Sequence, residues 1–170
     1  MKRALLVIVM AMLGSFAATA QEVDSVMIDS TEISIDDLVV KLNVLQHNYD
    51  YLYCNYELTK LILGLKDFST SVSVESNSLL INYYNTKFDK DTYTSYVGLY
   101  NAMSEQFNSL KENADATKLA VMCRVLESNL TEQELKVISS SLELIESSIS
   151  TGDRSLNYFK VVLDAYRNLR

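Results

Sequence analysis

Residues 35 to 65 carry two apolar stripes that both follow the period of an α-helix, and this pattern limits the fold more than any other feature. The first stripe advances in alternating steps of four and three residues through Leu38, Leu42, Leu45, Tyr49, Leu52, Tyr56, Thr59 and Leu63. The second stripe consists of Val40, Val44, His47, Tyr51, Cys54, Leu58, Leu61 and Leu65. At about 100° per residue the stripes lie on nearly opposite sides of one helix. The pattern therefore predicts a long first helix that is packed between neighbours or shared with another subunit.

The segment HNYDYLYCNYEL, residues 47 to 58, concentrates four tyrosines, the only histidine and one of the two cysteines. The helical period assigns Tyr49 and Tyr56 to the first stripe and Tyr51 to the second, and only Tyr53 falls outside both. Alternate tyrosines on their own are also typical of a strand. The uninterrupted helical period on either side favours a helix here.

Turn-forming residues are scarce, which favours a few long helices over β-structure. The chain has no proline and only four glycines. An all-β domain of this length needs many turns, and these are usually built with glycine and proline. The fold class predicted is all-α: a single antiparallel bundle of four to five helices with a long central first helix.

The helix boundaries in the first half follow from local composition. Residues 66–78 are rich in Ser, Thr and Val, which predicts a break after the first helix; one longer helix is the alternative. A short helical piece is expected over 79–88. A second long helix begins near Thr92 with Asp91 as its N-cap, and residues 113–115 are a point where it can be interrupted.

The second half shows the clearest helix start in the chain. Thr131-Glu132-Gln133-Glu134 fits a capping box, which predicts a third helix from there. Gly152 is well placed to end that helix. A last helix is then expected from Asp153.

The first 20 residues have the three-part layout of a secretory signal peptide. Lys2 and Arg3 give a basic start, residues 4–13 are an apolar run too short for a bilayer core of ~30 Å, and residues 18–20 are a small-residue cleavage signal. This layout predicts cleavage after Ala20 and export to the periplasm or the outside. A retained N-terminal anchor is the alternative.

After the leader we expect a flexible lead-in over residues 21–32 and a single helical-bundle domain over 33–170. Two short segments of the lead-in, around Ser25 and Ser30, resemble Asp-Ser/Thr acceptor sites of a periplasmic O-glycosylation system, and whether either serine is modified stays open. The leader holds two of the 15 basic residues and none of the 22 acidic ones, which leaves 13 against 22, a net charge of −9. That balance argues against nucleic-acid and anionic-membrane partners.

Motifs for metal binding and catalysis are missing from the sequence. His47 has no partner histidine for a Glu-x-x-His or H-E-x-x-H metal site, so a hydrogen-bonded packing role is the better interpretation. The serine motifs G-x-S-x-G and S-x-x-K are absent. Three pairs of nearby carboxylates leave a carboxylate-dependent glycan hydrolase as a remote alternative: Asp36 and Asp37, Asp89 and Asp91, and Glu143 and Glu146. We expect no enzyme activity, no cofactor and no metal.

The two cysteines allow one covalent hypothesis. Export to an oxidising compartment makes a disulfide between Cys54 and Cys123 conceivable, with two buried free thiols as the alternative.

The remaining hypothesis is contact with another protein. Tyrosine suits interfaces, and the chain has eleven, of which Tyr51, Tyr53, Tyr83 and Tyr84 are the candidate contact residues. The sequence therefore favours an exported, non-catalytic helical protein that acts by protein–protein contact, with a protein partner or a second copy and no small-molecule substrate. Two versions are a toxin-neutralising immunity or inhibitor protein and a subunit of an envelope transfer or secretion assembly. A self-associating structural bundle is a further alternative.

Overall fold

The computed structural model describes residues 34–85 and 88–169. The chain separates into two compact units, Met1–Leu38 and Val39–Arg170. In the first unit the description begins at Ser34, whose hydroxyl accepts a hydrogen bond of 3.1 Å from the backbone N–H of Asp37 and so caps the helix that follows. The predicted leader, its cleavage point, the lead-in and the two candidate glycosylation serines lie outside the described residues.

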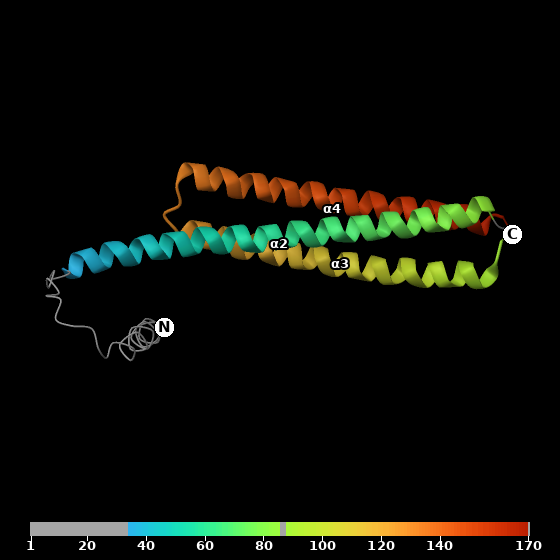
Figure 1. Cartoon of the computed structure of the whole chain (residues 1–170), viewed down its shortest axis with the longest axis horizontal. Helices are drawn as coiled ribbons and strands as arrows, with labels where there is room; N and C mark the ends of the chain where they lie inside the picture. The colour runs from blue at the N-terminus through green and yellow to red at the C-terminus, as the bar shows by residue number, and fades with distance from the viewer. Residues whose placement is uncertain (1–33, 86–87, 170) are drawn as a thin grey trace, which may run out of the picture. The chain divides into compact units, whose positions relative to one another are not determined.

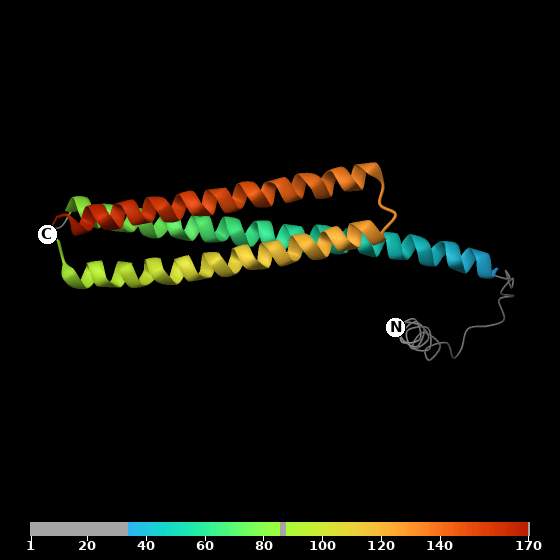
Figure 2. The same cartoon turned by 180° about the vertical axis from the view of Figure 1, so that it is seen from behind.

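Three helices account for 93% of the described residues, and these residues include no strand. They are α2 (Ile35–Asn85), α3 (Lys90–Glu127) and α4 (Glu132–Arg167) (Figure 1). In the second unit the three helices run side by side, and the opposite view shows the same arrangement (Figure 2). The all-α prediction is confirmed, whereas the described part of the chain holds three helices instead of four to five.

The break predicted over residues 66–78 does not occur, because the polar side chains there bond to the helix itself. Hydroxyls of this segment donate to the carbonyl four residues earlier, as Ser69 does to Leu65 at 3.0 Å and Thr70 to Lys66 at 3.0 Å. The apolar residues between them, Phe68 and Val72, are buried in the core. The alternative of one longer helix is therefore correct, since packing overrides the weak local preference.

The starts of α3 and α4 are fixed by their capping side chains. Asp89, and not Asp91, is the N-cap of α3, and its carboxylate accepts a hydrogen bond of 2.8 Å from the backbone N–H of Thr92. The helix then runs without interruption through 113–115, where Ala114 is fully buried. The capping box predicted at Thr131 is confirmed, with Thr131 and Glu134 bonded reciprocally.

Gly152 does not end a helix but lies in the middle of α4, which continues to Arg167. It is buried, and a Cβ atom placed there would overlap Cε2 of the Phe107 ring on α3 and lie 2.8 Å from its Cζ. The absence of a side chain lets the Phe107 ring enter the α3–α4 contact. That ring also stacks on Phe68 of α2, with the centroids 4.9 Å apart. One aromatic ring therefore joins all three helices, and the glycine makes room for it.

We expect Gly152→Ala to destabilise the protein by about 1–3 kcal/mol, because the added methyl group overlaps the Phe107 ring. Urea unfolding followed by circular dichroism measures the change. Gly98→Ala is the matched control: a methyl group added there would meet no neighbouring side chain within 4 Å, so that change should be neutral or stabilise by up to about 1 kcal/mol. Equal effects of the two substitutions would contradict the close approach.

Candidate interaction surface

The tyrosine-rich segment of α2 holds a buried ion pair rather than a reactive site. Asp50 is buried, and its Oδ1 accepts hydrogen bonds from Arg124 Nε at 2.8 Å and from Gln46 Nε2 at 2.9 Å. The Arg124 guanidinium also lies over the rings of Tyr49 and Tyr53, 5.3 and 5.0 Å from their centroids. We call these five residues the polar cluster. The polar cluster joins α2 to the end of α3. In it the Asp50 carboxylate and the Arg124 guanidinium compensate each other's charge.

The pKa of Asp50 reflects these contacts. Burial raises the pKa, but the hydrogen bonds from Gln46 and Arg124 and the attraction of the Arg124 charge outweigh burial, so the pKa lies below its ordinary value. The carboxylate is therefore charged at neutral pH and bound in a structural pair.

We expect Asp50→Asn to lower the free energy of unfolding by about 1–2 kcal/mol near pH 7. This is less than the loss of a fully buried ion pair costs, because Arg124 is partly exposed to water. The folded-state pKa is lowered, so the carboxylate contributes its stability above the ordinary Asp value of 3.8 and loses it as the pH falls through the lowered pKa. Urea titrations near pH 7, 5 and 3 should show a constant difference at the first two and a smaller one at the third. Asp67→Asn, at an exposed position of the same helix, is the control; a difference that widens in acid would contradict the pairing.

His47 has the packing role that its place in the second stripe predicts. Its Nε2 lies 3.1 Å from Oε1 of Glu134, whose other oxygen accepts the backbone N–H of Thr131 in the capping box at 2.8 Å. The imidazole therefore ties α2 to the start of α4, as Arg124 ties it to the end of α3. The described residues contain no group of three or more His, Cys, Asp and Glu that could hold a metal ion.

The two cysteines lie in different environments. Cys54 is fully buried in the core and Cys123 is exposed on α3, and both are free thiols in the structure. Burial raises the pKa of the Cys54 thiol. A Cys54–Cys123 bond and two free thiols stay the alternative hypotheses, and chemical labelling distinguishes them.

We expect Cys123 to react with a maleimide at pH 7.5 within minutes, whereas Cys54 reacts only when urea unfolds the chain, because its thiol is enclosed and poorly ionised. Mass spectrometry of peptides after timed labelling identifies each site. Cys123→Ser is the control, which should abolish the fast phase alone. If neither thiol reacts until a reductant is added, the two cysteines are bonded.

The four candidate contact tyrosines do not form one surface. Tyr51, Tyr53 and Tyr83 are half-buried and pack against the core, while Tyr84 is 76% exposed. The pair Tyr51 and Tyr53 is separated from Tyr83 and Tyr84 by about 30 residues of helix, or roughly 45 Å. All four candidate tyrosines belong to α2, but they do not mark its exposed face.

The carboxylate pairs lie on helix surfaces and ends. Asp36, Asp37, Glu143 and Glu146 are exposed, and Asp89 serves as the N-cap of α3. Glu146 accepts a hydrogen bond of 2.6 Å from Lys118, which joins α4 to α3. None of these carboxylates lines the cavities described below.

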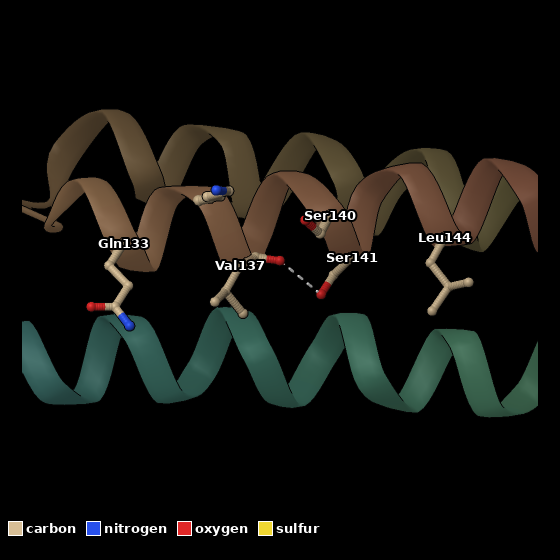
Figure 3. A pocket seen from close by; sticks show the side chains of 6 residues that line it. Gln133, Val137, Ser140, Ser141 and Leu144 are labelled. Atoms are coloured by element: carbon tan, nitrogen blue, oxygen red, sulfur yellow. Dashed lines mark hydrogen bonds between the residues drawn. The ribbon is translucent and has the colours of Figure 1, made fainter.

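Two grooves follow α4 on the side that faces α2. The larger, about 630 Å³, is lined by side chains of α4 that point toward α2, Gln133, Val137, Ser141 and Leu144 among them (Figure 3). The second, about 360 Å³, lies between Lys66, Ser69 and Thr70 of α2 and residues 144–151 of α4. Both are lined by hydroxyls, aliphatic side chains and single lysines, which supply neither an acid–base pair nor an activated nucleophile.

The feature that most needs explanation is the first stripe of α2, because it is exposed over its whole length. From residue 42 onward, its apolar members are between 52% and 64% exposed: Leu42, Leu45, Tyr49, Leu52, Tyr56 and Leu63. We call these residues, together with Thr59, the exposed stripe. The second stripe is buried from Cys54 onward, where Leu58, Leu61 and Leu65 face α3 and α4.

The long first helix is therefore not central, which corrects the sequence prediction. Each helix of a three-helix bundle turns one face to the other two, so two companions cover a single stripe. Residues 39–46 are exposed on every side of the helix, and there the second stripe is open as well, at Val40 and Val44. Among the described residues, no helix covers the opposite side of α2.

A smaller apolar area lies on α3. Leu119, Met122 and Leu126 are exposed at helical spacing, and the last two line a cavity of about 230 Å³ with Leu135 and Leu142 of α4. We call this area the α3 patch. It lies on a different helix from the exposed stripe, and residues of α3 and α4 line its cavity.

Comparison with protein-family models, with curated proteins and with solved structures finds no match for this chain. In the described part of the chain, no helix combines the length and the apolar character that crossing a membrane requires. The inference of function rests on the surfaces described above.

Proposed function

We propose that this chain is an exported, non-catalytic helical protein that acts by protein–protein contact through the exposed stripe of α2. The observation that carries the proposal is the exposure of six large apolar side chains in one continuous row. The leader-like first 20 residues support export.

The size of the stripe is compatible with a contact surface. At about 25 cal/mol per Å², the 1.5–3 kcal/mol gained by burying one large apolar side chain corresponds to roughly 60–120 Å² of apolar surface. The six side chains are 52% to 64% exposed. Together they present roughly 200–400 Å², which approaches the largest apolar patch of a typical monomer, and such patches are often functional. Because these residues form a single row on one helix, their surface is of the shape that a partner helix covers.

Rigidity of the stripe also supports this role. From Asp50 to Leu65, the opposite side of the same helix is anchored by Cys54, Leu58 and Leu65 in the core and by the Asp50–Arg124 pair. A surface held in place before binding loses little conformational entropy when a partner docks. The bundle then acts as a support that presents one face of α2.

In the organism that makes the protein, a photo-reactive benzoylphenylalanine at Leu52 should give a covalent adduct with another polypeptide after irradiation, because the contact places that side chain against the partner. The same group at Asp67, an exposed position of α2 outside the stripe, is the matched control and should give none. Adducts are detected by mass shift on denaturing gels. Absence of any adduct from Leu45, Leu52 and Tyr56 alike would overturn the proposed function.

A further inference from the structure

The spacing of the exposed stripe is that of a coiled coil. From Leu42 to Leu63 it advances by 3, 4, 3, 4, 3 and 4 residues, which is a heptad repeat with Leu42, Tyr49, Tyr56 and Leu63 at position a and Leu45, Leu52 and Thr59 at position d. An isolated helix has about 3.6 residues per turn, so a stripe with a repeat of about 3.5 stays in line only along a supercoiled partner helix. The next positions, Lys66 and Thr70, are polar and end the stripe.

The covered side of α2 shows what occupies such a stripe in this protein. Cys54, Leu58, Leu61, Leu65, Phe68 and Val72 repeat the same steps of four and three, and all are buried against α3 and α4. One heptad stripe of the helix is thus filled by helices. No helix of the described residues covers the other stripe, although the Arg124 guanidinium of α3 lies over the ring of its member Tyr49.

We propose that a second copy of this chain fills it, with the two α2 helices antiparallel and the exposed stripes in mutual contact; this inference rests on the proposed function and names its partner. An antiparallel coiled coil places a positions opposite d positions. The register that centres the first stripe, from Leu38 to Leu63, on its copy pairs Leu42 with Thr59, Leu45 with Tyr56, and Tyr49 with Leu52; Leu38 then meets Leu63. Each tyrosine then meets a leucine, whereas parallel pairing sets Tyr49 against Tyr49 and Tyr56 against Tyr56.

The charges beside the stripe are compatible with a second copy of this chain. The positions that flank it between residues 39 and 62 carry no carboxylate, and their only charged residues are Lys41 and Lys60. In the antiparallel register these lysines face Ile62 and Val39 of the second copy, so no like charges meet. The acidic residues of this part of α2, Asp50 and Glu57, lie at other heptad positions, and Asp50 is already paired with Arg124.

The area available is that of a modest homodimer interface. The stripe offers roughly 200–400 Å² of apolar surface per chain, and dimer interfaces are about 65% apolar, so the whole contact buries roughly 300–600 Å² per chain. A standard stable interface buries about 800 Å² per partner, so the stripe alone supplies roughly half of that area. On α4, Val137 and Leu144 are 41% and 42% exposed beside the α2–α4 groove and add to the area within reach of the second copy.

The test is the mass of purified residues 21–170 in solution, measured by sedimentation equilibrium over 1–100 µM. We expect a dimer with a dissociation constant in the low micromolar range or below. Leu52→Glu, which inserts a charge at the centre of both stripes, should raise that constant at least about 100-fold. Leu126→Glu on the α3 patch is the matched control and should leave it unchanged. Both positions are exposed, so circular dichroism should show both variants folded.

Cross-linking tests the orientation. In a Cys123→Ser background, Leu45→Cys and Tyr56→Cys in the same chain should give a disulfide-linked dimer on mild oxidation, because the register places these positions opposite each other within reach of a bond. Either single variant should stay unlinked, since each position lies about 16 Å along the axis from its own copy. A linked dimer from Leu45→Cys alone would overturn the antiparallel arrangement.

The outcomes separate this inference from the proposed function. A monomer at 100 µM overturns the homodimer, and so does a dimer that Leu126→Glu disrupts while Leu52→Glu does not. A monomer that still forms an adduct with a different polypeptide through Leu52 in the cell overturns the homodimer and retains the contact function. An adduct of twice the chain mass in the cell supports both.

Discussion

The structure depends on α2 having apolar residues on two opposite sides while only two other helices are available to cover them. α2 has 51 residues, against 38 in α3 and 36 in α4, so the companions are too short to cover even one side completely. Burial of Cys54, Leu58 and Leu65 takes the side that faces both companions. The exposure of the other side follows from this geometry, and it is the reason the bundle alone leaves so much apolar surface in water.

Two polar contacts determine the point along α2 from which α3 and α4 pack against it. Asp50 binds Arg124 near the end of α3, and His47 binds Glu134 near the start of α4, so the α3–α4 turn lies at this level of α2. Each contact gives a hydrogen bond to a polar group that would otherwise lower the stability of the fold if left without a partner beside the core. Each contact also forms at only one relative position of the helices along their axes. Apolar packing alone would tolerate a shift of one heptad along the repeating stripes, and these pairs discriminate against it.

The sequence predicted helix type and stripe geometry well because both follow from a periodic pattern many residues long. It was wrong about boundaries where a local signal conflicted with packing. The hydroxyls of residues 66–78 suggested a break but bond to their own helix, and Gly152 suggested an end but makes room for Phe107. The close approach of Gly152 and Phe107 joins residues far apart in the sequence, and no local pattern encodes it. The candidate site was found only in part, since tyrosine content singled out Tyr51 and Tyr53, which pack inward, while leucines form most of the exposed stripe.

The chemistry of the two stripes explains why one is inside and the other outside. The inward row carries Cys54, Leu58, Leu61, Leu65 and Phe68, which have no group that needs water. The outward row includes Tyr49, Tyr56 and Thr59, whose hydroxyls can stay hydrated while their carbon atoms contact a partner. A row of this kind is soluble enough to remain open in a monomer and apolar enough to gain from association. That balance is typical of a surface that must exist in both states, and it distinguishes the exposed stripe from a core face left bare by a missing helix.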